Sequence, residues 1–228
     1  MKNRVISVLR HIYTMGMAEE LDRLIVNPNG ECVAAGDPAQ YGYLQACKLE
    51  LPNFIRTSTE CINTSDYKSF VVDGFSMLPE GISNGDVLLC TAVSSEKKDV
   101  QKEVFSVIKV DEDYYKAKGK SLKFDYKLRK TLLYISANET VENIIENLQK
   151  FNDDILLPDN QDKLKEKYNE STSYYKQDLM LSITYKKGVL CYSFHPLYLI
   201  EYQTVYVLRL VDDNWEVRKA NHGRSELC

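Results

Sequence analysis

The chain has 228 residues, of which 44% are hydrophobic and 27% charged, and its formal net charge is −4. It is too apolar for a disordered protein, too evenly charged for one that coats nucleic acid, and long enough for a core without disulfide staples. No apolar run approaches eighteen residues and no export signal is evident, so we expect a cytoplasmic protein without a membrane span.

A helical pattern covers residues 2–26, where Val5, Leu9 and Ile12 fall on one face. Turn residues end this pattern, so 1–30 is predicted to form a helical N-terminal arm that is too short for a core of its own. Residues 31–66 are expected to form a linker that starts with small residues in an extended segment.

Strand-like alternation begins at about residue 67 and defines a first β-rich part, 67–138. Strands are predicted at 69–72, 87–93, 104–110 and 132–135. The acidic residues 111–113 are interpreted as a turn into a further strand that begins at Tyr114.

The pattern changes again in the segment 139–176. Thr140 is expected to begin a helix that runs through Ile144 and Leu148, and a polar stretch follows from residue 159. We interpret the whole segment as an insertion, which is either a solvated excursion or a partner-binding element.

The last part of the chain, 177–228, returns to strand patterns. These cover 179–185, 188–192 and 198–211, with a hairpin turn at 186–188. The predicted fold class is therefore mainly β, with a short helical arm and a polar, partly helical insertion.

Cysteine and histidine spacing gives no sign of a metal site. No CxxC pair and no histidine at ligand spacing accompany the cysteines, so we expect reduced thiols, no metal and no cofactor. His195 precedes Pro196 in an apolar, strand-like stretch, where a structural role is favoured over a catalytic one. The six cysteines stand at positions 32, 47, 61, 90, 191 and 228.

One passage, 72–89, combines features that can carry chemistry. A strand runs into Gly74, Ser76 follows, Pro79 stops regular structure, and Asn84-Gly85 turns the chain into the next strand. Glycine allows a backbone conformation that other residues avoid. Such a bend can present the Ser76 hydroxyl together with neighbouring amides, although an ordinary β-turn serine fits the local features too.

This order, G-x-S-M-x-P followed by G-D and an apolar strand, resembles the Ser–Lys peptidase domain of LexA-type repressors and of their UmuD and phage-repressor relatives. Residues 99–118 are similar to the family's hairpin with the catalytic lysine, 33–38 to its self-cleavage segment, and 200–209 to its last strand, although the family usually has glycine where Tyr202 stands. The resemblance covers 31–138 and 194–216. It implies a LexA-type β-clip peptidase fold.

The resemblance also implies roles: Ser76 as nucleophile, a strand lysine as general base, and backbone amides near Met77 for the oxyanion. A serine hydroxyl needs a base, and a lysine serves as one only when neutral, a form that burial favours. Lys116 and Lys118 share a face of the expected strand, so periodicity does not separate them. We prefer Lys116, because it follows an apolar residue as the family's lysine does, and keep Lys118 as the alternative.

In the family the self-cleavage segment is cut between Ala and Gly, which here corresponds to Ala35–Gly36. The small side chains suit a narrow site, and Gly36 reduces hindrance to attack. Gly36 lies 76 − 36 = 40 residues before Ser76, which leaves room for the segment to fold back. A scissile bond in the same chain has a high effective concentration, although an ordinary linker would also contain such residues.

Two departures from the family bear on partners. Only 35 residues precede the expected cut, too few for a helix-turn-helix DNA-binding domain, and the acidic balance offers no basic recognition face. The arm is more like that of UmuD, where cleavage trims an arm and changes the partners of a dimer. We expect a homodimer that cuts its own N-terminal segment as a regulatory or stress-response switch, with an activating protein or nucleoprotein filament as the candidate trigger. The alternative is a protein-binding module of the same fold with little or no catalysis.

Overall fold

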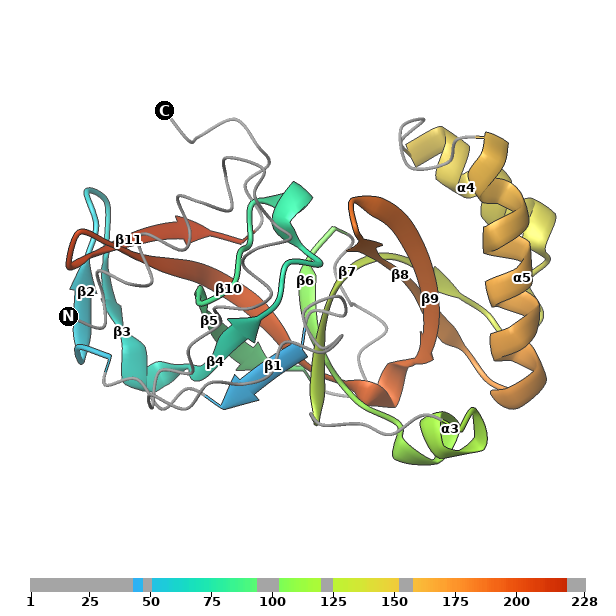
Figure 1. Ribbon diagram of the computed structural model, residues 1–228, viewed down its shortest axis with the longest axis horizontal. Helices are drawn as coiled ribbons and strands as arrows, with labels where there is room; N and C mark the ends of the chain where they lie inside the picture. Colours follow the sequence, from blue (N-terminus) through green and yellow to red (C-terminus); the bar gives the residue numbers. More distant parts are fainter. Residues whose placement is uncertain (1–42, 47–50, 94–102, 120–124, 152–157, 221–228) are drawn as a thin grey trace.

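The computed structural model describes residues 43–46, 51–93, 103–119, 125–151 and 158–220 (Figure 1). In these ranges nine strands form one antiparallel sheet in the order β1-β4-β5-β10-β6-β7-β8-β9, with β11 paired to β10. The predicted mainly β fold class is confirmed. The strands of this sheet are β1 (Tyr43–Ala46), β4 (Lys68–Asp73), β5 (Val87–Ala92), β6 (Phe105–Lys109), β7 (Tyr126–Ile135), β8 (Leu179–Lys186), β9 (Val189–Pro196), β10 (Ile200–Val211) and β11 (Asn214–Lys219).

Strand β1 closes part of the sheet into a ring. It pairs with β4 on one side and with β7 on the other, so Tyr43 lies opposite both Asp73 and Lys127. The ring contains β1, β4, β5, β10, β6 and β7. Alternate side chains of its strands meet in one buried cluster, as a closed sheet requires. This cluster includes Phe70, Val72, Leu88, Phe105, Val107, Leu128 and Val207.

A separate two-stranded hairpin, β2 (Phe54–Arg56) with β3 (Cys61–Asn63), covers another part of the sheet. Its buried residues Ile55 and Ile62 pack with Leu89 of β5 and Leu208 of β10. The hairpin therefore protects the face of the ring strands that the central cluster does not use.

The second half of β7 leaves the ring and pairs with β8. Strand β8 in turn forms a long hairpin with β9, and Lys187 and Gly188 at its tip have φ angles of 50° and 76°. Two positive φ angles are the geometry of a tight hairpin turn, so the turn predicted at 186–188 is confirmed.

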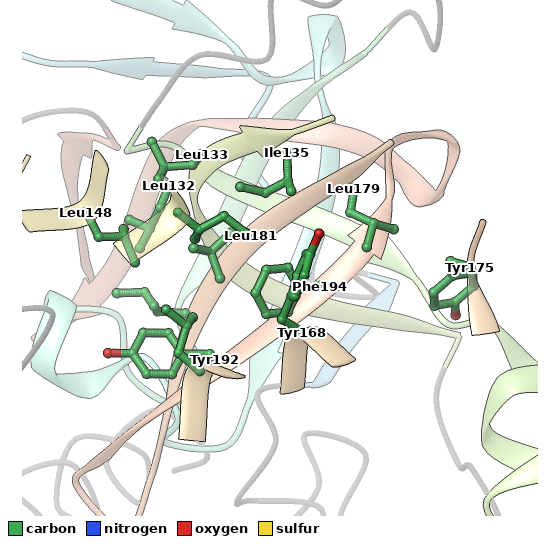
Figure 2. Packing of buried hydrophobic residues seen from close by; sticks show 13 residues of the cluster. Leu132, Leu133, Ile135, Leu148, Tyr168, Tyr175, Leu179, Leu181, Tyr192 and Phe194 are labelled. Atoms are coloured by element: carbon green, nitrogen blue, oxygen red, sulfur yellow. The ribbon is translucent and has the colours of Figure 1, made fainter. Parts of the chain in front are cut away.

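Two helices, α4 (Val141–Phe151) and α5 (Pro158–Tyr174), cover one face of β7, β8 and β9 (Figure 1). Ile144 and Leu148 of α4 and Leu164 and Tyr168 of α5 are buried there, and Figure 2 shows their neighbours on the sheet. The helix expected through Ile144 and Leu148 is confirmed. The segment 139–176, which we interpreted as an excursion or a partner-binding element, supplies side chains to the core.

The predicted strand at Tyr114 is wrong, because residues Glu112–Ala117 form the helix α3. The Asp111 side chain accepts a hydrogen bond from the Tyr114 amide at 2.9 Å, and Glu112 and Asp113 lie in the first turn. A capping carboxylate and acidic residues at the positive end of the helix dipole stabilise a helix start. The acidic residues thus begin a helix, and the returning strand starts only at Tyr126.

We predict that Leu164→Ala lowers the free energy of unfolding by about 2–5 kcal/mol, because it leaves a cavity under α5. Leu164 is fully buried, whereas Lys163 beside it is exposed. Urea denaturation of Lys163→Ala should show a change within about 0.5 kcal/mol. Equal small effects in both variants would contradict the packing of α5 on the sheet.

Candidate functional site

The candidate site lies on the turn that leaves β4, residues 74–81, which we call the serine turn. Gly74 has a φ of 111°, and its amide donates a hydrogen bond to Asn84 Oδ1 at 2.9 Å. Gly85 also has a positive φ, of 81°. The unusual backbone predicted at Gly74 and the tight turn at Asn84-Gly85 are therefore confirmed.

A buried ion pair fixes the end of the serine turn. Asp86 has no exposed surface, and its carboxylate accepts hydrogen bonds from Arg209 Nε at 2.9 Å and from Arg209 Nη2 at 2.7 Å. The same Nη2 donates to the Gly81 carbonyl at 2.8 Å, and the Ser83 amide donates to Asp86 at 2.8 Å. Asp86 raises the pKa of Arg209. Asp86, the second residue of the G-D pair, thus anchors the serine turn to β10.

Ser76 is held by its backbone and not by its side chain. Its carbonyl accepts hydrogen bonds from the Tyr185 amide at 2.9 Å and from Thr184 Oγ1 at 3.3 Å, both on β8. The residue is only 3% exposed, and its buried Oγ has no hydrogen-bond partner among the described residues. A buried hydroxyl without a partner is uncommon, and it marks this serine for attention.

The amides of Ser76 and Met77 are candidates for binding an acceptor. Among the residues that the structure describes, none accepts a hydrogen bond from the Ser76 or Met77 amide. The Met77 carbonyl accepts from the amides of Glu80 and Ile82, which fixes the peptide units that follow. Two adjacent backbone donors on a fixed turn are the usual means of stabilising an oxyanion.

The structure does not bring Lys116 or Lys118 to Ser76. Lys116 lies on α3, its side chain is 68% exposed, and its Nζ lies 2.9 Å from Glu112. Lys118 Nζ lies 2.6 Å from Glu170 of α5. These carboxylates raise the pKa of both lysines, the opposite of what a general base requires. Figure 1 shows α3 at the end of the molecule away from the short helical turn that follows β4.

A different lysine, Lys130 of β7, meets the serine turn. Its Nζ lies 2.9 Å from Glu80 Oε2, and the two side chains are 17% and 15% exposed. Tyr185 of β8 donates from its hydroxyl to the other oxygen, Glu80 Oε1, also at 2.9 Å. Lys130 pairs with Phe105 on β6, whose side chain shares the buried cluster with Met77. Lys130 therefore reaches the serine turn from the ring side of β7.

Sequence reasoning missed Lys130, Glu80 and Tyr185 as site residues. Glu80 stands four residues after Ser76 in the quoted motif, but the motif alone assigns it no partner. The sequence does contain a signal for Lys130. In a strand, residues 128, 130 and 132 lie on one face, which places Lys130 between two leucines on an apolar face. The strand prediction began at 132, so this alternation was not used.

The other face of β7 carries a second buried polar group, with Lys127 and Arg129. The Lys127 ammonium contacts the Tyr115 hydroxyl and lies 3.6 Å from the centroid of that ring. His195 of β9 is hydrogen-bonded to Ser182, which agrees with the structural role predicted for this histidine. Burial, together with the charges of Arg129 and Lys127, lowers the pKa of His195 to about 3. It is therefore neutral at physiological pH.

The expected cleavage bond, Ala35–Gly36, lies outside the described residues. The structure does describe β1, which begins seven residues after Gly36 at Tyr43. Because β1 runs antiparallel to β4 and Tyr43 pairs with Asp73, the chain enters β1 at the end of the ring where β4 leads into Ser76.

Comparisons with protein families, with curated proteins and with solved structures found no match. Within the described ranges, no group of three or more His, Cys, Asp or Glu side chains is arranged to hold a metal ion. No helix in those ranges is both long and apolar enough to cross a membrane. The functional interpretation therefore depends on the geometry of the serine turn and its neighbours.

We predict that Arg209→Lys lowers the free energy of unfolding by about 3 kcal/mol, since an ammonium cannot replace the two-pronged contact with buried Asp86. Arg56→Lys, at an exposed position of β2, serves as the matched control and should cost little. Urea denaturation at pH 7 measures both. A loss in the Arg209 variant no larger than in the control would contradict the anchoring role.

We predict that acid destabilises the protein through His195. Its pKa is about 3 in the folded state and near 6.5 in an unfolded chain, so the unfolded state alone takes up the proton as the pH falls below 6.5. This linkage costs about 2 kcal/mol of stability between pH 7 and pH 5. His195→Gln can still form a hydrogen bond with Ser182. Between pH 7 and pH 5 this variant should lose about 2 kcal/mol less stability than the unmodified chain. Identical pH dependences in urea titrations would contradict the prediction.

Proposed function

We propose that this chain is a self-cleaving serine peptidase of the LexA/UmuD type, with a β-clip fold, and that it cuts its own segment at Ala35–Gly36. Ser76 is the nucleophile, and Lys130 takes the role of general base that we first assigned to Lys116. The observation that carries the proposal is the Ser76 hydroxyl, buried and without a hydrogen-bond partner, on a turn to which Lys130 is joined through Glu80.

The surroundings of Lys130 support its assignment. A lysine acts as a base only after it loses its proton, and shielding from water favours the neutral amine. The Lys130 side chain is largely shielded, whereas that of Lys116 is mostly exposed. Lys127, the other lysine of β7, contacts Tyr115 of α3 on the opposite face of the strand. Lys130 is thus the best placed of these three lysines.

The path of β1 supports cleavage within one chain. Tyr43 pairs with Asp73, three residues before Ser76, so the chain upstream of β1 starts near the nucleophile. Seven residues separate Gly36 from Tyr43, and an extended chain of that length spans at most about 25 Å. A scissile bond tethered so closely has a high effective concentration, which allows a slow dyad to cut once.

The proposed reaction has two steps. In the first, neutral Lys130 accepts the Ser76 hydroxyl proton while Oγ attacks the Ala35 carbonyl carbon, and the Ser76 and Met77 amides stabilise the oxyanion. The bond to Gly36 then breaks, and the leaving amine takes the proton from Lys130. In the second, water hydrolyses the ester, which frees residues 1–35 and regenerates Ser76. The products are a 35-residue fragment and a fragment of 228 − 35 = 193 residues.

A second function, a protein-binding module with little catalysis, is favoured by one contact. Lys130 is bonded to Glu80 and makes no hydrogen bond with Ser76. Under this alternative, the Lys130–Glu80 ion pair only fastens the serine turn to β7. Removal of the Ser76 hydroxyl would then leave partner binding unchanged.

We expect the purified full-length chain to split into the two fragments at alkaline pH, where more of Lys130 is neutral. Intact-mass spectrometry over time measures the rate, and Ser76→Ala and Lys130→Ala should each lower it by at least about 10³-fold, as the loss of a nucleophile or its base does.

Two control variants keep this test specific. Lys116→Ala should cleave at the unmodified rate, as should Lys186→Ala, which removes an exposed lysine next to Tyr185. A chain that stays intact at every pH, with or without an activating nucleoprotein filament, would favour the binding module. Cleavage that persists in Lys130→Ala but stops in Lys116→Ala would show that Lys116 of α3, and not Lys130, is the base.

A further inference from the structure

We propose that Glu80 is an inhibitory latch, which holds the Lys130 side chain in an ion pair and away from Ser76 until the serine turn moves. The inference rests on the proposed peptidase function and concerns the regulation of that site.

The geometry of the Glu80 carboxylate is that of a clamp between two strands. Oε2 accepts from Lys130 of β7 and Oε1 from the hydroxyl of Tyr185 of β8, each at 2.9 Å. The Glu80 backbone is also tied down, because its amide donates to the Met77 carbonyl at 3.0 Å and its carbonyl accepts from Arg218 at 3.4 Å. Glu80 is therefore positioned by four contacts, two at its carboxylate and two at its backbone.

The chemistry of this contact opposes catalysis. The Glu80 carboxylate engages the Lys130 amine in an ion pair, and both side chains are largely shielded from water. An ammonium has no lone pair with which to accept the Ser76 proton. The two observations agree: Lys130 is bonded to Glu80, and the Ser76 Oγ has no hydrogen-bond partner among the described residues.

The latch and the nucleophile belong to one movable unit. Ser76 and Glu80 lie on the same serine turn, while Lys130 belongs to β7. A shift of the turn along β7 would exchange the partner of Lys130, from the Glu80 carboxylate to the Ser76 hydroxyl. Tyr185 controls this shift from β8, because its amide holds the Ser76 carbonyl and its hydroxyl holds Glu80. Release of Tyr185 would therefore loosen both Ser76 and Glu80, while Arg209 still holds the Gly81 carbonyl.

The test compares Glu80→Gln with the unmodified full-length chain. Glutamine keeps the size and one acceptor oxygen but removes the charge, and its amide nitrogen can donate to the Tyr185 hydroxyl. Self-cleavage at pH 7.5 should rise about tenfold, because the carboxylate that holds Lys130 away from Ser76 is gone. Ser76→Ala/Glu80→Gln must not cleave, which ties the gain to Ser76. Tyr185→Phe, which removes one hydroxyl, should give a smaller rise in the same direction.

A second readout does not depend on cleavage. Acetylation of Lys130 by a low concentration of an N-hydroxysuccinimide ester, followed by peptide mass spectrometry at pH 8, reports how much of this amine is neutral and released. The exposed Lys150 is the internal reference. Lys130 should react about tenfold faster in Glu80→Gln than in the unmodified chain, measured in the Ser76→Ala background so that no chain is cut.

The outcomes separate the two proposals. Faster acetylation with no cleavage in any variant overturns the peptidase, and with it the regulatory role. Cleavage in the unmodified chain that slows in Glu80→Gln overturns the latch and makes Glu80 a positioning residue, while the peptidase stands. Unchanged acetylation and unchanged cleavage in Glu80→Gln overturn the latch alone.

Discussion

The contact between Asp86 and Arg209 determines where the serine turn lies. A carboxylate with no exposed surface is stable only when its charge is paired and its oxygens are bonded, and Arg209 supplies both conditions from β10. Because β10 pairs with β5, β6 and β11, one guanidinium joins the end of the turn to the strand shared by most of the ring. This contact holds the end of the turn in one place on β10.

The start of the turn is held from the other side, by β8. The Tyr185 amide and the Thr184 hydroxyl bind the Ser76 carbonyl, so the turn spans from the ring to the hairpin that α5 covers. Between these two anchors the Ser76 hydroxyl has no partner, although an unsatisfied buried polar group costs about 1–3 kcal/mol. The backbone contacts at both ends offset that cost, and they leave the side chain available for another bond.

The sequence predicts best those parts of the fold that depend on local chemistry. Gly74 and Gly85 adopt positive φ angles, which glycine allows whatever surrounds it, and the helix through Ile144, with Thr140 at its start, follows from neighbouring residues. The course of the chain after β6 was not predictable in this way. Tyr114 is compatible with a strand as well as with a helix. Asp111 caps the helix in the structure, but aspartate is equally common in turns, so the sequence alone does not decide between them.

The lysine of the site was missed for a related reason. Lys127 and Arg129 are buried in β7, so charged residues stand where an alternating pattern leads one to expect the solvent side. The strand prediction therefore began only at 132 and left out Lys130. The predicted base, Lys116, came from the family resemblance, and the structure places it on α3. The local sequence does not indicate which residues of different strands pair, such as Lys130 with Phe105. This follows only from the three-dimensional fold. The anchors of the turn likewise depend on residues more than 100 positions apart, as for Asp86 and Arg209.

The place of β1 in the ring limits what the proposed cleavage can change. A cut at Ala35–Gly36 lies upstream of β1, so the larger fragment keeps every strand that the structure describes, including the pairs that close the ring. Cleavage would therefore leave the fold and the serine turn intact, and its effect would come from the loss of the arm. A single-use reaction of this kind needs restraint more than speed, because each chain can be cut only once. In the proposed mechanism, the ion pair between Glu80 and Lys130 would provide such restraint by keeping the base away from Ser76.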